Sequence, residues 1–109
     1  MKVSLKLKDD KFLIEYGGKT VGFAVFDYRF FDNGWIELLE IEEEYRGKGI
    51  GVQAVNKLCE ICKTKKIFTS TNESNAPMRK MLEKAGFEYM GKVEGLDDGD
   101  PELFFRRML

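Results

Sequence analysis

The chain has 109 residues, a length that predicts a single domain over residues 1–109. Hydrophobic residues make up 43% of it and charged residues 34%, so it has enough apolar side chains for a core. Its net charge of −1 lacks the basic excess typical of nucleic-acid-binding proteins, and we expect no nucleic-acid partner. No apolar run approaches the roughly 20 residues of a membrane span, and the first residues show no signal-peptide pattern. We therefore expect a cytoplasmic protein with no membrane partner.

The chain contains no histidine and two cysteines. Without histidine, Ser-His-Asp triads, Cys-His dyads and histidine general bases are excluded. Cys59 and Cys62 have C-x-x-C spacing, but they fall in a segment of helical periodicity, which favours buried thiols over the alternative of a redox pair. Zinc needs four ligands and there is no second cysteine pair, so we expect no metal site.

The first half of the chain is predicted to form antiparallel strands joined in hairpins. The expected strands cover residues 2–7, 11–16, 21–31 and 35–41. Gly17 and Gly18 form a two-residue connection of the kind that supplies positive φ to a tight turn. The turn of the second hairpin is expected at Asp32-Asn33-Gly34.

The second half is predicted to alternate helices with strands, because the apolar period changes from two to 3.6 residues at Gly49. The expected elements are a helix beginning at Gly49, a strand over 67–71, a helix between Asn75 and Gly86, and strands over 87–93 and 102–108. A strand, a glycine-rich turn, a helix and a strand in succession predict a βαβ unit with parallel strands. The fold class is therefore α/β, a mixed sheet with N-terminal antiparallel strands, a central βαβ unit, and a C-terminal helix plus two strands.

Three alternating glycines, Gly47, Gly49 and Gly51, lie between a predicted strand and a predicted helix. Glycines let a ligand approach the backbone closely, and the first helical turn offers unpaired N–H groups and the positive end of the helix dipole. These features are typical of a phosphate or pyrophosphate site. The G-x-G-x-G spacing differs from the G-x-G-x-x-G of dinucleotide folds, which leaves a nicotinamide-binding fragment and a plain glycine-rich turn as alternatives.

Two motifs in order carry a family resemblance. Arg46-x-x-Gly49-x-Gly51 matches the acyl-CoA pyrophosphate signature Q/R-x-x-G-x-G/A, and Asn75 opens a helix that ends in Lys84-Ala85-Gly86-Phe87. With these motifs the chain, over residues 20–109, resembles the GCN5-related N-acetyltransferase superfamily. It resembles a short form, since the helices that usually follow the first strand are missing.

The resemblance implies that the fourth and fifth strands diverge and that the pantetheine arm of acetyl-CoA lies between them. It also implies that a backbone N–H at or near Ile41 polarises the thioester carbonyl. The implied cofactor-binding residues are Leu39, Glu40, Ile41, Arg46, Gly47, Lys48, Gly49, Ile50, Gly51, Val52 and Asn75.

The implied reaction is direct attack on acetyl-CoA by a primary amine of an unidentified small-molecule or protein acceptor, in a ternary complex. An amine with a pKa of ~10.4 must first lose a proton, and without histidine a carboxylate is the natural base. Glu37 is the candidate, two residues before Leu39 on the same strand face if pairing is regular, and a bulge could exchange its role with that of Glu40. The alternative function is a non-catalytic acyl-CoA-binding module.

Departures from the family pattern narrow these expectations. Leu82 stands where many members have a tyrosine that protonates the thiolate. The alternatives are therefore water, another tyrosine such as Tyr45 or Tyr89, or no protonating group at all. Ser70 replaces the glutamate of members that acetylate protein N-termini, so that activity is disfavoured. The missing helices predict an open acceptor side, which suits either a large or protein acceptor or a homodimer in which a partner chain rebuilds the wall. The strand over residues 103–105 is expected to be exposed and apolar, and this favours the homodimer. The acidic residues interpreted as a solvated turn are Asp97, Asp98, Asp100 and Glu102.

Overall fold

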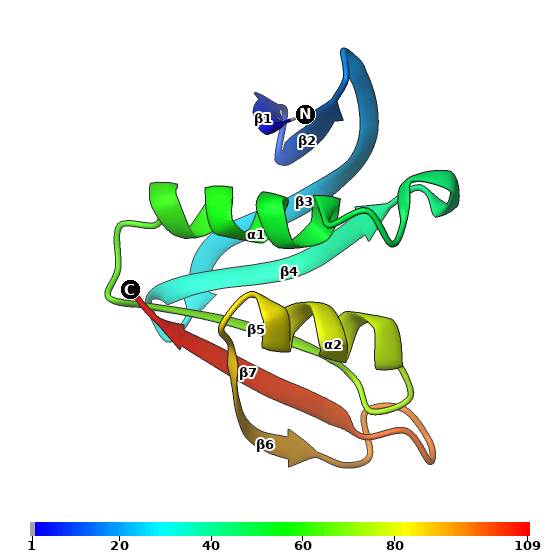
Figure 1. The fold of residues 1–109 in the computed structure, drawn as a ribbon. Coiled ribbons are helices and arrows are strands. Elements are labelled where there is room, and N and C mark those ends of the chain that lie inside the picture. Colours follow the sequence, from blue (N-terminus) through cyan, green and yellow to red (C-terminus); the bar gives the residue numbers. More distant parts are fainter. Residues whose placement is uncertain (1) are drawn as a thin grey trace.

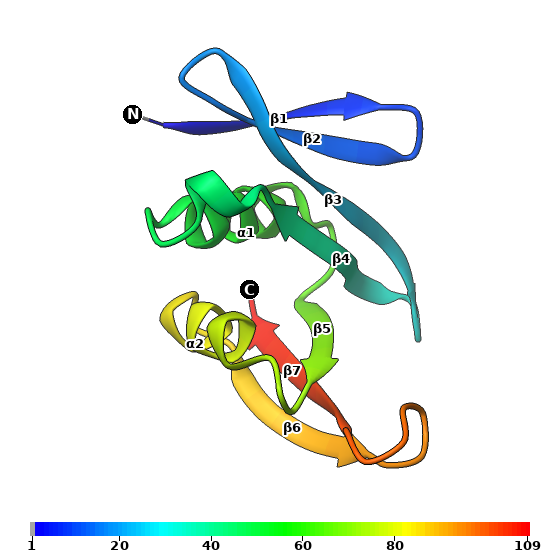
Figure 2. The same cartoon turned by 90° about the vertical axis from the view of Figure 1, so that its right-hand side faces the viewer.

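The computed structural model describes residues 2–109 as a mixed seven-stranded sheet with two α-helices on one face (Figures 1 and 2). The strands are β1 (Val3–Lys8), β2 (Lys11–Tyr16), β3 (Lys19–Phe30), β4 (Asn33–Ile41), β5 (Lys66–Asn72), β6 (Glu88–Val93) and β7 (Glu102–Met108). The helices are the short 3-10 helix η1 (Glu43–Tyr45), α1 (Ile50–Ile61) and α2 (Ala76–Lys84).

The strand order is β1-β2-β3-β4-β5-β7-β6. Every neighbouring pair is antiparallel except β4 and β5, which are parallel and connected through α1. This topology confirms the predicted α/β class, the N-terminal hairpins and the central βαβ unit. Neither helix of residues 2–109 has the length and apolar character needed to cross a membrane.

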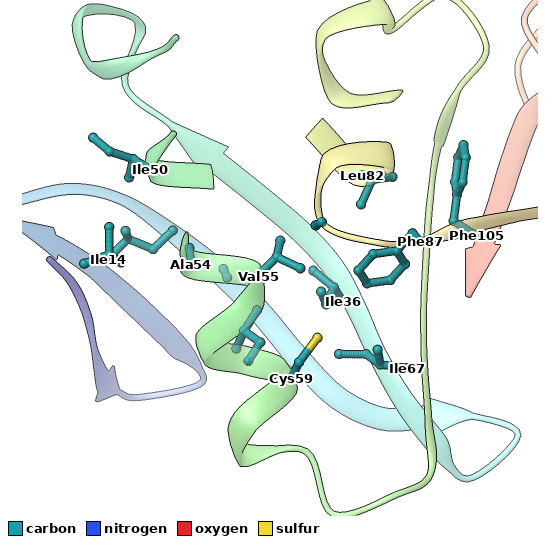
Figure 3. Packing of buried hydrophobic residues seen from close by; sticks show 14 of the residues in the cluster. Ile14, Ile36, Ile50, Ala54, Val55, Cys59, Ile67, Leu82, Phe87 and Phe105 are labelled. Carbon is teal, nitrogen blue, oxygen red and sulfur yellow. The ribbon is translucent and has the colours of Figure 1, made fainter. Parts of the chain in front are cut away.

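One apolar core lies between the helices and the sheet (Figure 3). Helix α1 presents a buried stripe at helical spacing, and α2 adds Leu82, which is fully buried. The buried stripe of α1 consists of Ile50, Ala54, Val55, Leu58 and Cys59. Cys59 is buried as predicted, and its burial raises the pKa of the thiol, whereas Cys62 is half-buried.

The turn between β3 and β4 lies earlier than the sequence predicts. Its central residues are Phe31 and Asp32, with φ of 54° and 61°, so that Asn33 and Gly34 belong to β4. A glycine at position 34 is required by packing and not by the geometry of a turn. A Cβ at this position would lie 2.5 Å from the Cys62 sulfur.

The expectation of an exposed last strand is wrong. Strand β7 lies between β5 and β6, and its residues Leu103 and Phe105 are buried in the core. The edge of the sheet on this side is formed by β6, which lies along the outer side of β7. Sheet order depends on this non-local pairing, which the local apolar pattern of β7 does not reveal.

Candidate active site

Strands β4 and β5 pair over a short distance and then separate, as Figures 1 and 2 show. Their ladder ends at Ile36 and Thr69, where the Thr69 hydroxyl donates a 2.8 Å hydrogen bond to the Ile36 carbonyl. Beyond this point β4 continues to Ile41 and β5 continues to Asn72, but the two strands no longer pair with each other. The divergence implied by the family resemblance is therefore present.

A β-bulge in β4 coincides with the point of divergence. Phe26 of β3 pairs with Ile36, and Val25 pairs with Leu38, so Glu37 is the extra residue. Glu37 and Leu38 together oppose Val25, and both of these β4 side chains are exposed. Regular pairing, which would place Glu37 on the same face as Leu39, does not occur.

The backbone of β4 beyond the bulge presents hydrogen-bonding groups to the gap. The Glu42 N–H donates to the Val21 carbonyl of the β3 segment at 2.8 Å. Since N–H directions alternate along a strand, those of Leu39 and Ile41 point the other way, toward β5. The Ile41 N–H thus has the direction that polarisation of a thioester carbonyl in the gap requires.

The glycine loop leads into the first turn of α1. Gly47 and Gly49 have φ of 76° and 80°, and a Cβ on either would have no atom within 4 Å. The first helical bond joins the Gln53 N–H to the Gly49 carbonyl at 3.2 Å. Helix geometry leaves the preceding N–H groups without intrahelical partners, and Gly49 has no side chain to cap them. These open N–H groups suit an anion.

The glycine loop, β4 and α2 enclose a cleft of about 540 Å³. Its lining residues are Leu39, Glu40, Ile41, Tyr45, Arg46, Gly47, Gly49, Ile50, Gly51, Val52, Asn75, Pro77, Met78, Lys80, Met81 and Lys84. All of the residues expected to bind the cofactor line it except Lys48, whose ammonium lies 5.6 Å from the ring centroid of Tyr45. A second hollow, of about 580 Å³, lies between α2, β6 and β7 and does not include the glycine loop.

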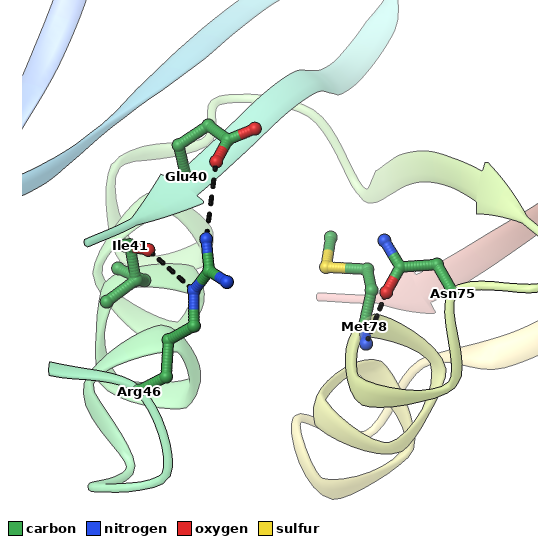
Figure 4. Close-up of polar contacts among 5 residues, drawn as sticks. All are labelled: Glu40, Ile41, Arg46, Asn75 and Met78. Carbon is green, nitrogen blue, oxygen red and sulfur yellow. Dashed lines mark hydrogen bonds and ion pairs between the residues drawn. The ribbon is translucent and has the colours of Figure 1, made fainter. Parts of the chain in front are cut away.

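Arg46 is oriented by contacts with β4 (Figure 4). Its Nε donates to the Ile41 carbonyl at 2.8 Å, and one Nη lies 3.9 Å from a Glu40 carboxylate oxygen. Both partners of that ion pair are more than half exposed, so the pair contributes little to stability. Its consequence is positional, because it helps to hold Arg46 against β4 at the wall of the cleft.

Asn75 has a structural role at the start of α2 as well as a place in the cleft. Its Oδ1 accepts a 3.2 Å hydrogen bond from the Met78 N–H, which caps the helix (Figure 4). The side-chain nitrogen has no acceptor within residues 2–109. It is the part of Asn75 that could reach a ligand.

The contribution of α2 to the cleft was mostly missed by the sequence analysis. Met78 and Met81 follow the helical stripe expected of core residues, and Lys80 and Lys84, four residues apart, resemble an exposed face. In the sequence, the signal for this contribution was the third glycine of the motif, Gly51. In the structure, a Cβ at Gly51 would lie 3.3 Å from Met81 Cγ, so the glycine allows α1 and α2 to approach each other.

Few side chains in the cleft, or in the gap between β4 and β5, can donate or accept a proton. Leu82, at the family's tyrosine position, is fully buried, and Tyr89 lines the second hollow, which leaves Tyr45 as the phenol in the cleft. On β5, the Ser70 hydroxyl donates a 2.7 Å hydrogen bond to Glu102 of β7. The Glu102 carboxylate therefore lies next to Ser70, the position at which family members that acetylate protein N-termini carry a glutamate.

Comparison with known proteins agrees with this geometry. Residues 5–87 match the model of the acetyltransferase (GNAT) family. The chain belongs to the GNAT family. The match begins earlier than the motifs, which place the resemblance in residues 20–109, and it includes most of the β1–β2 hairpin.

Individual GNAT relatives support the assignment. Spermine/spermidine N(1)-acetyltransferase of Bacillus subtilis strain 168 is 31% identical over 90 residues, covering 72% of this chain and 59% of that protein. The chain thus spans less than two thirds of that curated relative. A GNAT acetyltransferase from Bacillus cereus has a TM-score of 0.85 at 33% identity, covering 91% of this chain and 70% of the other. One from Elizabethkingia anophelis, solved with acetyl-CoA bound, shares the fold with a TM-score of 0.79 at 18% identity, covering 92% and 77%.

Proposed function

We propose that the protein is an N-acetyltransferase that transfers an acetyl group from acetyl-CoA to a primary amine in a ternary complex. The observation that carries this proposal is the single cleft that joins the open N–H groups of α1 to the diverging edge of β4. The proposed unit is one domain, residues 1–109, that works without a metal ion.

The cleft suits the parts of acetyl-CoA. The N–H groups of the first α1 turn and Arg46 would hold the pyrophosphate, and Lys80 and Lys84 add positive charge on the opposite wall. Leu39 and Ile41 would bond the pantetheine arm as an added strand does. When bound, acetyl-CoA supplies an activated thioester carbonyl.

The amine acceptor would bind on the face of the sheet that points away from the helices. Glu37, on the bulge at the mouth of the gap, is the proposed general base, and Glu102 is a second candidate. A cationic amine fits this acidic surface. Because a curated relative is named for acetylating spermine and spermidine, these polyamines are the first acceptors to test.

The alternative is a module that binds acyl-CoA without transferring the acyl group. It is favoured by Leu82, which removes the usual phenol, and by the lack of a helix over the acceptor side within residues 2–109.

One experiment decides between the two. Thermal shift with CoA and with NAD establishes which cofactor binds, and release of free thiol from acetyl-CoA is then followed with a panel of polyamines, other small amines and lysine peptides. An enzyme releases thiol only when a suitable amine is present. A CoA-dependent shift without thiol release for any amine supports the binding module, and a shift with NAD alone contradicts both.

A further inference from the structure

Ser70 lies on β5 at the border of the gap between β4 and β5. It follows Thr69, the last residue of β5 that pairs with β4, so its β4 side is unpaired. Burial alternates along β5, where Ile67, Thr69 and Thr71 are buried and Ile67 belongs to the core beneath the helices. Because side chains alternate along a strand, the half-buried Ser70 side chain lies on the opposite face, where the amine acceptor would bind.

The proton of the Ser70 hydroxyl is committed to Glu102 of β7. Ser70 Oγ donates to Glu102 Oε2 at 2.7 Å, a distance typical of a hydroxyl bound to a carboxylate. An ionised carboxylate only accepts hydrogen bonds, so the direction of this bond is fixed. Toward the gap, Ser70 Oγ therefore offers lone pairs and no proton. No other group of residues 2–109 donates to this oxygen.

Glu102 is available for this contact because it has no competing cation. The ion pairs within residues 2–109 use Asp27, Glu40, Glu60 and Glu88 as their carboxylates. A carboxylate that accepts from a hydroxyl makes the hydroxyl oxygen a stronger acceptor, since hydrogen bonds in a chain polarise one another. The charge of Glu102 thus strengthens the acceptor that Ser70 presents at the gap.

We propose that Ser70 selects the acceptor by accepting a hydrogen bond from its N–H, and that Glu102 is the positioning residue that keeps the serine oxygen in this role. An amine that attacks a carbonyl carbon uses its lone pair and still carries N–H groups. An alcohol or thiol that has lost its proton has no hydrogen left to donate. The pair therefore favours amines over alcohols and thiols, an inference that deepens the proposed function and rests on it.

This role is separate from that of the general base. Glu37 on β4 is the proposed proton acceptor, whereas Ser70 on β5 would orient the nitrogen from the other side of the gap. Loss of an orienting contact weakens binding of the amine, so its effect should appear in the amine Kd and KM before it appears in kcat.

The test compares two cations of equal charge, butylamine in its protonated form and butyltrimethylammonium, which has no N–H. Each is titrated calorimetrically into the protein saturated with CoA, which has no acyl group to transfer. The wild-type protein should bind butylamine about tenfold more tightly than the quaternary cation, because one hydrogen bond to a charged group has an effect of this order. Ser70→Ala should reduce that ratio of Kd values several-fold.

Three further variants separate the N–H contact from charge and from structure. Glu102→Gln should also lower the ratio, because an amide can donate to Ser70 as well as accept from it. The lost charge affects both cations alike and cancels in the ratio. Ser70→Thr keeps the hydroxyl and should keep the ratio. The matched control is Ser74→Ala, since Ser74 Oγ donates to Asp100 Oδ2 at 2.6 Å in the loop after β5, and it should behave like the wild type.

An unchanged ratio in Ser70→Ala, with folding verified by circular dichroism, overturns the proposal. If Ser70→Ala does not fold, an unchanged ratio in Glu102→Gln does the same. An equal fall in Ser74→Ala, or a wild-type protein that does not prefer butylamine, also overturns it. Thiol release from acetyl-CoA is measured separately with the wild-type protein. A preference for the N–H cation that depends on Ser70, without thiol release for any amine, supports the role of Ser70 and contradicts the proposed acetyl transfer.

Discussion

Gly49 meets two requirements that no other residue type meets together. Its φ of 80° is in the left-handed region, and its position before α1 is one where a serine or aspartate side chain would fold over the first N–H groups. A glycine holds the backbone conformation and leaves those groups open. The same residue therefore sets the conformation of the loop and leaves its N–H groups free to bind an anion.

Two substitutions separate these effects. Gly49→Val should abolish CoA binding and also lower stability by about 1–2 kcal/mol, because a β-branched residue is strained at positive φ. Gly49→Asn tolerates that φ, so it should weaken CoA binding at nearly unchanged stability. Calorimetric titration with CoA and thermal unfolding measure the two quantities.

Gly99 provides the matched control, since it has φ of 74° and equally open surroundings in a distant loop. Gly99→Val should lose similar stability and bind CoA normally. Normal CoA affinity in Gly49→Asn would refute the assignment of this loop to the pyrophosphate.

Glu37 is the residue to change for the chemical step. Glu37→Gln keeps the shape of the side chain but cannot accept a proton, so we expect kcat to fall by about 100-fold or more with KM for acetyl-CoA unchanged. Steady-state kinetics with the best amine measures both. Glu44→Gln, in the exposed 3-10 helix, is the control. If instead Glu102→Gln alone lowers kcat, the base is on β7 and Glu37 has no catalytic role.

Among the secondary-structure elements, α2 has a larger part in the site than its sequence suggests. Lys80 and Lys84 lie on the cleft wall opposite the glycine loop. We expect Lys80→Gln/Lys84→Gln to raise Kd for CoA several-fold, and the loss to shrink at high salt because these charges are partly screened. Titrations at two ionic strengths measure it, and Lys57→Gln, on α1 and outside the cleft, should change nothing. Equal affinities for the two variants would place the nucleotide elsewhere.

The junction of β4 with the end of α1 depends on close packing at Gly34. Gly34→Ala should destabilise the protein by about 1–3 kcal/mol, because its Cβ would meet the Cys62 sulfur at 2.5 Å. Cys62→Ala removes that sulfur, so the double variant should recover most of the loss relative to Cys62→Ala alone. Chemical denaturation of the four proteins gives the coupling energy. A coupling near zero would show that the strain lies against Phe26 or Ile67, the next nearest neighbours.

A structural feature could be predicted from the sequence when the pattern that indicates it lies within one short segment of the chain. The change of period at Gly49 and the glycine spacing are local, and they located α1 and the loop that lines the cleft. The bulge at Glu37 is not, since it exists only relative to the pairing of β4 with β3. The turn at Phe31 and Asp32 was missed because two non-glycine residues adopt positive φ there. The place of β7 inside the sheet likewise depends on distant pairing.

At the scale of the whole molecule, the sheet consists of two parts joined by few contacts. Strands β1 to β4 form one part and β5 to β7 the other, and the ladder between them has three residue pairs. Helix α1 packs against β1 and β4 of the first part, and its Asn56 Oδ1 accepts a 2.8 Å hydrogen bond from Arg107 of β7 in the second part. A ligand that bonds to β4 and also contacts α2 therefore ties the two parts together.

Amide hydrogen exchange should detect this effect at Leu39 and Ile41. In the free protein their N–H groups point into the gap and should exchange quickly for strand residues, while the N–H groups of β4 that pair with β3 exchange slowly. Acetyl-CoA should slow exchange at Leu39 and Ile41 selectively and raise the melting temperature, since it binds only the folded state. NAD should do neither. Protection that appears only around α1, with Leu39 and Ile41 unchanged, would mean that the pyrophosphate binds while the pantetheine arm stays outside the gap, and the proposed polarising role of the Ile41 N–H would then be wrong.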